Sequence, residues 1–130
     1  MTDAELTQAG ATYTILVVDD NDTARWLLGE MLAAEGYVVL EANCADEAIA
    51  ILERSPEVRA VVTDIEMPGL IDGLELARRI VAGLPGVAVL LTSGRHQPAL
   101  DGLPHATRFM PKPYGYGELL AHLEILIPRS

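Results

Sequence analysis

The stretch "VVTDIEMPG", from Val61 to Gly69, places a carboxylate at the end of an apolar run. Its valines are β-branched and favour a strand, whereas the Met-Pro-Gly sequence shortly after Asp64 is typical of a turn. Residues 58–64, "VRAVVTD", therefore predict a short buried strand that ends on an aspartate. What this aspartate does depends on the elements around the strand.

Four other runs share this character, because each is short, apolar or β-branched, and bounded by glycine, proline or polar residues. They are "TILVVDD" (14–20), "YVVLEA" (37–42), "GVAVLLTS" (86–93) and "TRFM" (107–110). Stretches with helical spacing of apolar residues separate the strands, at 24–32, 45–52, 74–81 and, after the last strand, 119–127. A segment at 96–104 holds two prolines and a glycine, so a helix there is expected to be short or irregular. This alternation predicts a doubly wound α/β fold, with a five-stranded parallel sheet covered by helices on both faces.

Length and composition predict one soluble domain. The 130 residues suit a single core at 13–130, and residues 1–12, which lack periodicity, are expected to be a flexible tail. No apolar run approaches the roughly 20 residues of a bilayer span, and the polar, acidic start does not resemble a signal peptide, so a cytoplasmic protein is expected. Cys44 stands alone, which excludes a disulfide framework.

The net charge of −10 indicates which classes of macromolecule the chain is expected to bind. It would repel phosphate backbones, so direct binding to nucleic acid is not expected, and protein partners are favoured instead. No membrane association is expected, and the chain is expected to be a monomer or a weak homodimer.

Polar residues gather at the predicted strand ends. They are Asp19, Asp20, Asp64, Ser93 and Lys112. In doubly wound sheets the ligand site lies just beyond the C-terminal ends of the strands. Three carboxylates at one edge would repel one another unless a hard divalent cation lay among them, and oxygen ligands suit Mg²⁺. The strand ends therefore predict a magnesium site.

Each of these residues also has an ordinary interpretation when it is taken alone. Asp19, Asp20 and Asn21 are all suitable N-caps for the first helix. Asp64 fits a turn, and Lys112 fits a solvated surface. Only their coincidence at one end of one sheet favours a functional site.

Five short motifs follow one another along the chain: "LVVDDN", "VVTDIEMPG", "DGLELARRI", "TSG" and "FMPKP". Together, from about Thr14 to Ile127, they resemble the receiver domain of bacterial two-component response regulators, in the stand-alone, single-domain form. The resemblance implies a flavodoxin-like sheet with strand order 2-1-3-4-5. It also implies a part in a phosphorelay, with a histidine kinase or a histidine phosphotransfer protein as donor and a downstream protein as target.

The resemblance assigns roles at the site. Asp64 would be the phosphoacceptor and would form an aspartyl phosphate. Asp20 and Asp64 would bind Mg²⁺ directly, Asp19 through water, and Glu66 through its backbone carbonyl group. Lys112 would contact a phosphoryl oxygen.

The resemblance also implies a switch. Ser93, followed by a glycine, fits the signalling hydroxyl better than Thr92, although threonine is commoner at that position. Phe109 would be the aromatic that moves inward on phosphorylation, and a plain core phenylalanine is an equal alternative. The output face would comprise the segment 96–104, the strand 107–110 and the last helix.

Three further residues carry hypotheses. Glu66 lies two residues beyond Asp64, and Arg95 lies two residues beyond Ser93. An ion pair between Glu66 and Arg95 would obstruct the water molecule that attacks the aspartyl phosphate. Two solvated charges with little interaction are the alternative. Trp26 lies off the apolar stripe of its helix, where it either docks a kinase helix or covers the core.

Two other functions remain open from the sequence. A small Mg²⁺-dependent phosphatase would use Asp64 as a turnover nucleophile and Glu66 as its general acid. A pseudo-receiver would bind partners without phosphorylation. The favoured interpretation is not a turnover enzyme, and its only reactions would be self-catalysed phosphotransfer and slow autodephosphorylation.

Overall fold

The computed structural model describes residues 12–95 and 106–128. Its centre is a five-stranded parallel sheet in the order β2-β1-β3-β4-β5, which confirms the expected fold and strand order. The strands are β1 (Thr14–Val18), β2 (Val38–Ala42), β3 (Val58–Asp64), β4 (Ala88–Ser93) and β5 (Thr107–Pro111). The tail expected at 1–12, apart from Thr12, and the irregular helix expected at 96–104 lie outside the described residues.

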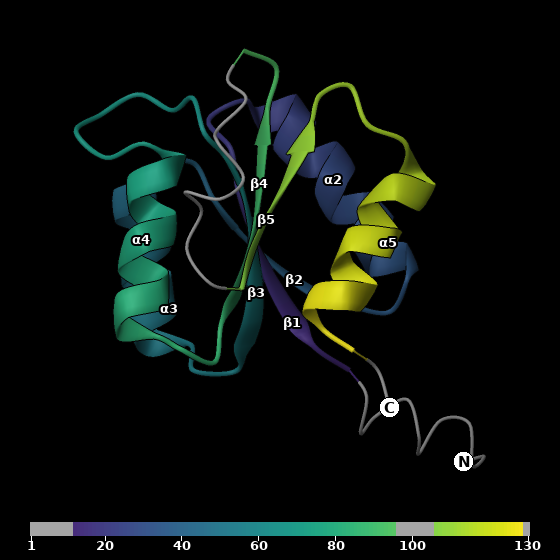
Figure 1. Ribbon diagram of the computed structural model, residues 1–130, viewed down its shortest axis with the longest axis horizontal. Helices are drawn as coiled ribbons and strands as arrows, with labels where there is room; N and C mark the ends of the chain where they lie inside the picture. Colours follow the sequence, from purple (N-terminus) through teal and green to yellow (C-terminus); the bar gives the residue numbers. More distant parts are fainter. Residues whose placement is uncertain (1–11, 96–105, 129–130) are drawn as a thin grey trace.

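Helices cover both faces of the sheet, as Figure 1 shows. They are α2 (Asp22–Ala34), α3 (Ala45–Arg54), α4 (Gly73–Gly83) and α5 (Tyr116–Leu126). The helices α3 and α4 pack on one face, and α2 and α5 pack on the other. No helix within the described residues is both long and apolar enough to span a bilayer.

The three central strands, β1, β3 and β4, are largely apolar because both of their faces are buried, whereas the edge strands β2 and β5 are partly exposed. In β1, Leu16 and Val18 join the core beneath α3 and α4, whereas Ile15 and Val17 join the core beneath α2 and α5. Alternate side chains of a strand point to opposite faces, so each face receives its own apolar layer. This double burial is why the strands lack the polar alternation of a half-exposed sheet.

Side-chain caps determine where two helices begin at the carboxyl edge of the sheet, which is the edge where the strands end. The Asn21 side chain accepts a hydrogen bond from the Ala24 amide at 2.8 Å and caps α2. Asp72 accepts one from the Glu75 amide at 2.9 Å and caps α4. Of the three residues suited to cap the first helix, the structure uses Asn21, so the carboxylate of Asp20 is available for another role.

Candidate functional site

The parallel register brings the strand ends together at one edge, toward which the arrows of β4 and β5 point in Figure 1. Asp64 at the end of β3 is paired with Thr92 of β4, and Ser93 is paired with Pro111 of β5. A pocket of about 640 Å³ opens at this edge. Its lining residues are Asp20, Asp64, Glu66, Met67, Pro68, Gly94, Arg95 and Lys112.

Three carboxylates form the centre of the site. Asp19, Asp20 and Asp64 each offer an oxygen, and these oxygens all lie within 4.8 Å of one another. Asp19 and Asp64 are buried, whereas Asp20 is exposed to the pocket. Among the described residues, the buried Oδ1 of Asp64 has no hydrogen-bond partner. An unpaired buried carboxylate oxygen is costly unless a ligand meets it, so the donor set fits a hard cation such as Mg²⁺.

Lys112 supplies the positive charge of the site. Its Nζ lies 3.3 Å from Oδ2 of Asp64 and 3.7 Å from Oδ2 of Asp19. Burial works to lower the pKa of Lys112, but the charges of the two aspartates outweigh it, so that the pKa is raised. The ammonium group therefore remains charged beside the carboxylates.

The pKa of Asp64 is raised. Burial is the largest cause; Lys112 opposes it, and the negative charges of Asp19 and Glu66 add to it. A carboxylate that holds its proton more tightly is also a better electron-pair donor once it is ionised. The site thus combines a basic carboxylate with a nearby cation, which suits attack on an electrophilic centre such as phosphorus.

Gly73 fixes the backbone that carries Asp64. Its amide donates a hydrogen bond of 2.9 Å to the carbonyl oxygen of Ile65. A Cβ atom at position 73 would lie 2.2 Å from the carbonyl oxygen of Asp64 and 2.8 Å from Cα of Ile65, so the close approach requires glycine. The first residue of α4 is therefore packed directly against the end of β3.

Ser93 contacts the site through its hydroxyl group. Its Oγ donates a 2.5 Å hydrogen bond to Oε2 of Glu66 and accepts one of 3.0 Å from the Arg95 amide. Thr92, the alternative hydroxyl, is buried within β4. Glu66 and Arg95 are thus connected through Ser93, and the salt bridges among the described residues do not include the ion pair proposed between their side chains.

Phe109 and Trp26 are not among the described residues that line this pocket. Phe109 is buried in the core beneath α3 and α4, beside Leu91 of the neighbouring strand. Trp26 is 56% exposed on α2, in agreement with its place off the apolar stripe. Leu27 falls on the apolar spacing that predicts a buried stripe at 24–32, but it is 50% exposed, so its expected burial is wrong. The stripe that α2 buries is centred on Leu28 and Leu32 instead.

Arg25 is a residue of the site that the sequence analysis does not identify. Its Nη1 donates to the backbone carbonyl oxygen of Asp19 at 2.7 Å. Its Nε and Nη2 donate to Glu41 at 2.9 Å and to Asp22 at 2.7 Å. A cation three residues after Asp22 was the only available signal in the sequence, and it does not reveal the contact with a backbone carbonyl group.

Comparisons with known proteins agree with this geometry. A family model described as the response regulator receiver domain matches residues 15–124. The chain is 35% identical over 119 residues to the response regulator MprA of Mycolicibacterium vanbaalenii, covering 89% of this chain and 51% of that protein. It is 31% identical over 128 residues to the sensor kinase CckA of Brucella abortus, covering 95% of this chain and 13% of the kinase.

A solved structure shows the same architecture. The response regulator protein TrrA of Thermotoga maritima, in complex with Mg²⁺-BeF, superposes with a TM-score of 0.79 at 32% identity, covering 88% of this chain and 98% of that chain. The chain spans about half the length of the MprA proteins it matches. The family match extends over most of the chain, and the chain therefore belongs to the response regulator receiver domains.

Proposed function

We propose that this chain accepts a phosphoryl group on Asp64 from a phosphohistidine of a kinase or phosphotransfer protein, in a Mg²⁺-dependent reaction. The observation that carries the proposal is the state of the Asp64 carboxylate. One oxygen lies 3.3 Å from Lys112, and the other is buried without a partner among the described residues. A carboxylate held in this way at an open pocket is positioned to accept a group from outside.

In the transfer, a carboxylate oxygen of Asp64 attacks the phosphorus atom of the donor. The new O–P bond forms as the N–P bond breaks, and the imidazole nitrogen of the donor leaves with the bonding electron pair. The Lys112 ammonium, already beside Oδ2 of Asp64, lies where it would meet a phosphoryl oxygen. In the slow hydrolysis that follows, water attacks the same phosphorus atom and releases inorganic phosphate and free Asp64.

Asp19, Asp20, Asp64 and the backbone carbonyl group of Glu66 would hold the magnesium ion. When bound, Mg²⁺ offsets the negative charge of the acids and orients phosphoryl oxygens for transfer. The structure supports this assignment by the proximity of the three carboxylates and by the unpaired oxygen of Asp64. Within the described residues, a single ammonium group, that of Lys112, forms salt bridges with Asp19 and Asp64, so the cluster has room for more positive charge.

The response to phosphorylation is proposed to begin at Ser93. An aspartyl phosphate adds a charge of about −1.5 to −2 and strong acceptor oxygens, which would attract the Ser93 hydroxyl group. Movement of that group would change the packing next to Phe109 and alter the face that includes β5 and α5. A protein partner in the cytoplasm would read this face, and the chain would not act as a turnover enzyme.

The test is to incubate the chain with Mg²⁺ and acetyl phosphate and to follow its intact mass over time. We expect one phosphoryl adduct per chain, hydrolysed slowly and absent from Asp64→Asn. Glu53→Gln, at the opposite end of the sheet, should behave as wild type. Rapid release of phosphate without a lasting adduct would indicate a phosphatase instead, and no adduct at all would indicate a partner-binding module that is not phosphorylated.

Trp26 is proposed to dock a helix of the phosphodonor protein. The indole is half-exposed, and the neighbouring Leu27 extends its apolar surface. Trp26→Ala should lose transfer from the kinase or phosphotransfer protein but keep phosphorylation by acetyl phosphate. Equal loss of both reactions would show that Trp26 supports the fold instead of the encounter.

A further inference from the structure

We propose that Glu66 is a positioning residue that holds the Ser93 hydroxyl group away from the phosphoryl group and so opposes the phosphorylated state. The inference rests on the proposed function, since it concerns how the Asp64 site responds once it is loaded. Its basis is the hydrogen bond of 2.5 Å from Ser93 Oγ to Glu66 Oε2. We call this contact the Glu66–Ser93 latch.

The latch joins two segments that are far apart in the sequence. Glu66 lies in the loop after β3, and Ser93 ends β4, 27 residues later. Ser93 is 2% exposed, so its hydroxyl group has little access to water as an alternative partner. The Arg95 amide donates to the same Oγ atom at 3.0 Å, which directs the hydroxyl hydrogen toward Glu66.

A serine hydroxyl group has one hydrogen to donate. It therefore cannot serve the Glu66 carboxylate and a phosphoryl oxygen on Asp64 at the same time. Hydrogen bonds to a charged acceptor are roughly twice as strong as neutral ones. Breaking the Glu66–Ser93 latch costs free energy. This cost therefore reduces the net stabilisation that the Ser93 hydroxyl group can give to the phosphoryl group.

Electrostatic repulsion is the competing explanation for an effect of Glu66. Its carboxylate lines the same pocket as Asp64, and its charge contributes to raising the pKa of Asp64. Repulsion alone would oppose an incoming anion whether or not position 93 carries a hydroxyl group. The latch differs from repulsion in one respect, because it requires Ser93.

A double-mutant cycle separates the two explanations. The affinity of the full chain for beryllofluoride, an analogue of the phosphoryl group, is measured by calorimetry at constant Mg²⁺ concentration. The variants are Glu66→Ala, Ser93→Ala, the double variant and wild type, with Glu53→Ala as a matched removal of one carboxylate far from the site. Glu66→Gln adds a neutral acceptor of the same size.

We expect Glu66→Ala to tighten beryllofluoride binding by about five- to tenfold when Ser93 is present, since a charge-assisted hydrogen bond no longer competes. In the Ser93→Ala background the gain should fall to about twofold or less. Glu66→Gln should lie between wild type and Glu66→Ala, and Glu53→Ala should match wild type. Ser93→Cys, a weak donor, should behave like Ser93→Ala and replaces it if that variant does not fold.

An equal gain from Glu66→Ala in both backgrounds would overturn the latch and leave repulsion as the explanation. The absence of any gain with Ser93 present would also overturn it. Failure of wild type to bind beryllofluoride, together with the absence of an acetyl phosphate adduct, would reject the proposed function itself. The two failures therefore give different results.

Discussion

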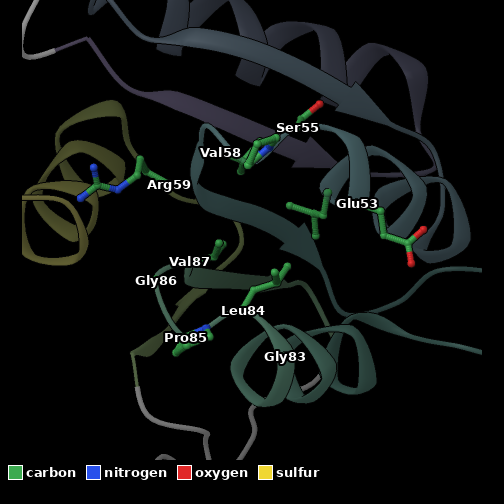
Figure 2. Close-up of a pocket in the computed structure, with 11 residues that line it drawn as sticks. Glu53, Ser55, Val58, Arg59, Gly83, Leu84, Pro85, Gly86 and Val87 are labelled. Atoms are coloured by element: carbon green, nitrogen blue, oxygen red, sulfur yellow. The ribbon is translucent and has the colours of Figure 1, made fainter.

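The two ends of the sheet carry pockets of similar size and opposite character. The pocket at the carboxyl edge measures about 640 Å³, and the pocket at the amino edge about 530 Å³. The second is lined mostly by apolar residues from the ends of α3 and α4, the start of β3 and the connection between α4 and β4. Figure 2 shows this pocket, with the charged groups of Arg59 and Glu53 extending away from one another.

Among the described residues, the two ends differ in whether the pocket includes a buried carboxylate oxygen without a hydrogen-bond partner. At the amino edge, the Arg59 guanidinium lies 5.0 Å from the centre of the Tyr13 ring, a contact that stabilises the cation. At the carboxyl edge, an oxygen of Asp64 is buried and unpaired within the part of the chain that the structure describes. Pocket size therefore does not distinguish the two ends of this molecule, whereas the unpaired oxygen of Asp64 does.

The largest effect is expected from adding a methyl group at the carboxyl edge. Gly73→Ala would place Cβ 2.2 Å from the carbonyl oxygen of Asp64, and relief of this overlap should cost about 3 kcal/mol of unfolding free energy. Gly86→Ala is the matched control, since a Cβ at that position, beside the amino-edge pocket, meets no atom within 4 Å. Urea denaturation measures both variants, and equal stabilities would contradict the close packing.

A second comparison removes one arginine from each end. Arg25→Met should lower the unfolding free energy by about 2 kcal/mol, because charge-assisted hydrogen bonds to the Asp19 carbonyl group, Glu41 and Asp22 are lost. Arg59→Met should cost about 0.5 to 1 kcal/mol, the range of a cation–π contact. Thermal or urea denaturation gives both values. Equal losses would show that Arg25 does not anchor the carboxyl edge.

Magnesium should stabilise the chain through the carboxyl edge. At ten times its dissociation constant, a ligand that binds only the folded state adds about 1.4 kcal/mol. Asp20→Asn should reduce this gain, because it removes one exposed carboxylate of the cluster without disturbing the core. Glu53→Gln should retain the gain. Denaturation with and without Mg²⁺, at matched ionic strength, measures the effect, and an undiminished gain in Asp20→Asn would place the ion elsewhere.

The smallest effect concerns a histidine away from both pockets. His122 Nδ1 accepts a 2.9 Å hydrogen bond from Arg108 Nε. Burial lowers the pKa of His122, the charge of Arg108 lowers it further, and Glu118 opposes them. The unfolded chain then binds the proton more readily, so the unfolding free energy should fall as the pH drops below about 6.5.

The loss from His122 should stay below about 1 kcal/mol, because the group is partly exposed. His122→Gln, which keeps an acceptor but does not titrate, provides the reference. The difference between wild type and this variant is measured by denaturation from pH 7.5 to pH 5.5. A difference that stays constant across this range would contradict the lowered pKa.

The sequence predicted the parts of the molecule that depend on local pattern. Alternating apolar strands and amphipathic helices predicted the layers, and the resemblance supplied the strand order, which the structure confirms. Because parallel strands end at one edge, Asp19, Asp20 and Asp64 could be expected to meet there, as they do in the structure. The Ser93 hydroxyl group donates to Glu66, which lines the pocket, and the choice of Ser93 over Thr92 as the signalling hydroxyl stays a prediction.

The sequence did not predict contacts that depend on side-chain conformation between distant segments. The Glu66–Ser93 latch and the contact between Arg25 and the Asp19 carbonyl group are of this kind. Charge complementarity suggested an ion pair between Glu66 and Arg95, whereas the structure links the two residues through Ser93, whose hydroxyl group donates to the Glu66 carboxylate and accepts from the Arg95 amide. Helical spacing alone also could not show that the sheet leaves Leu27 uncovered.

The backbone contact between Gly73 and Asp64 has a consequence for engineering. It holds the backbone of Asp64 and Ile65 against the start of α4 through main-chain atoms. Leu70, in the loop of residues 66–72, is fully exposed, so substitutions at its position are expected to be tolerated. In a synthetic signalling circuit built on this chain, we therefore expect substitutions at Leu70 to leave the backbone position of Asp64 unchanged, so that the loop could be redesigned around a fixed carboxylate.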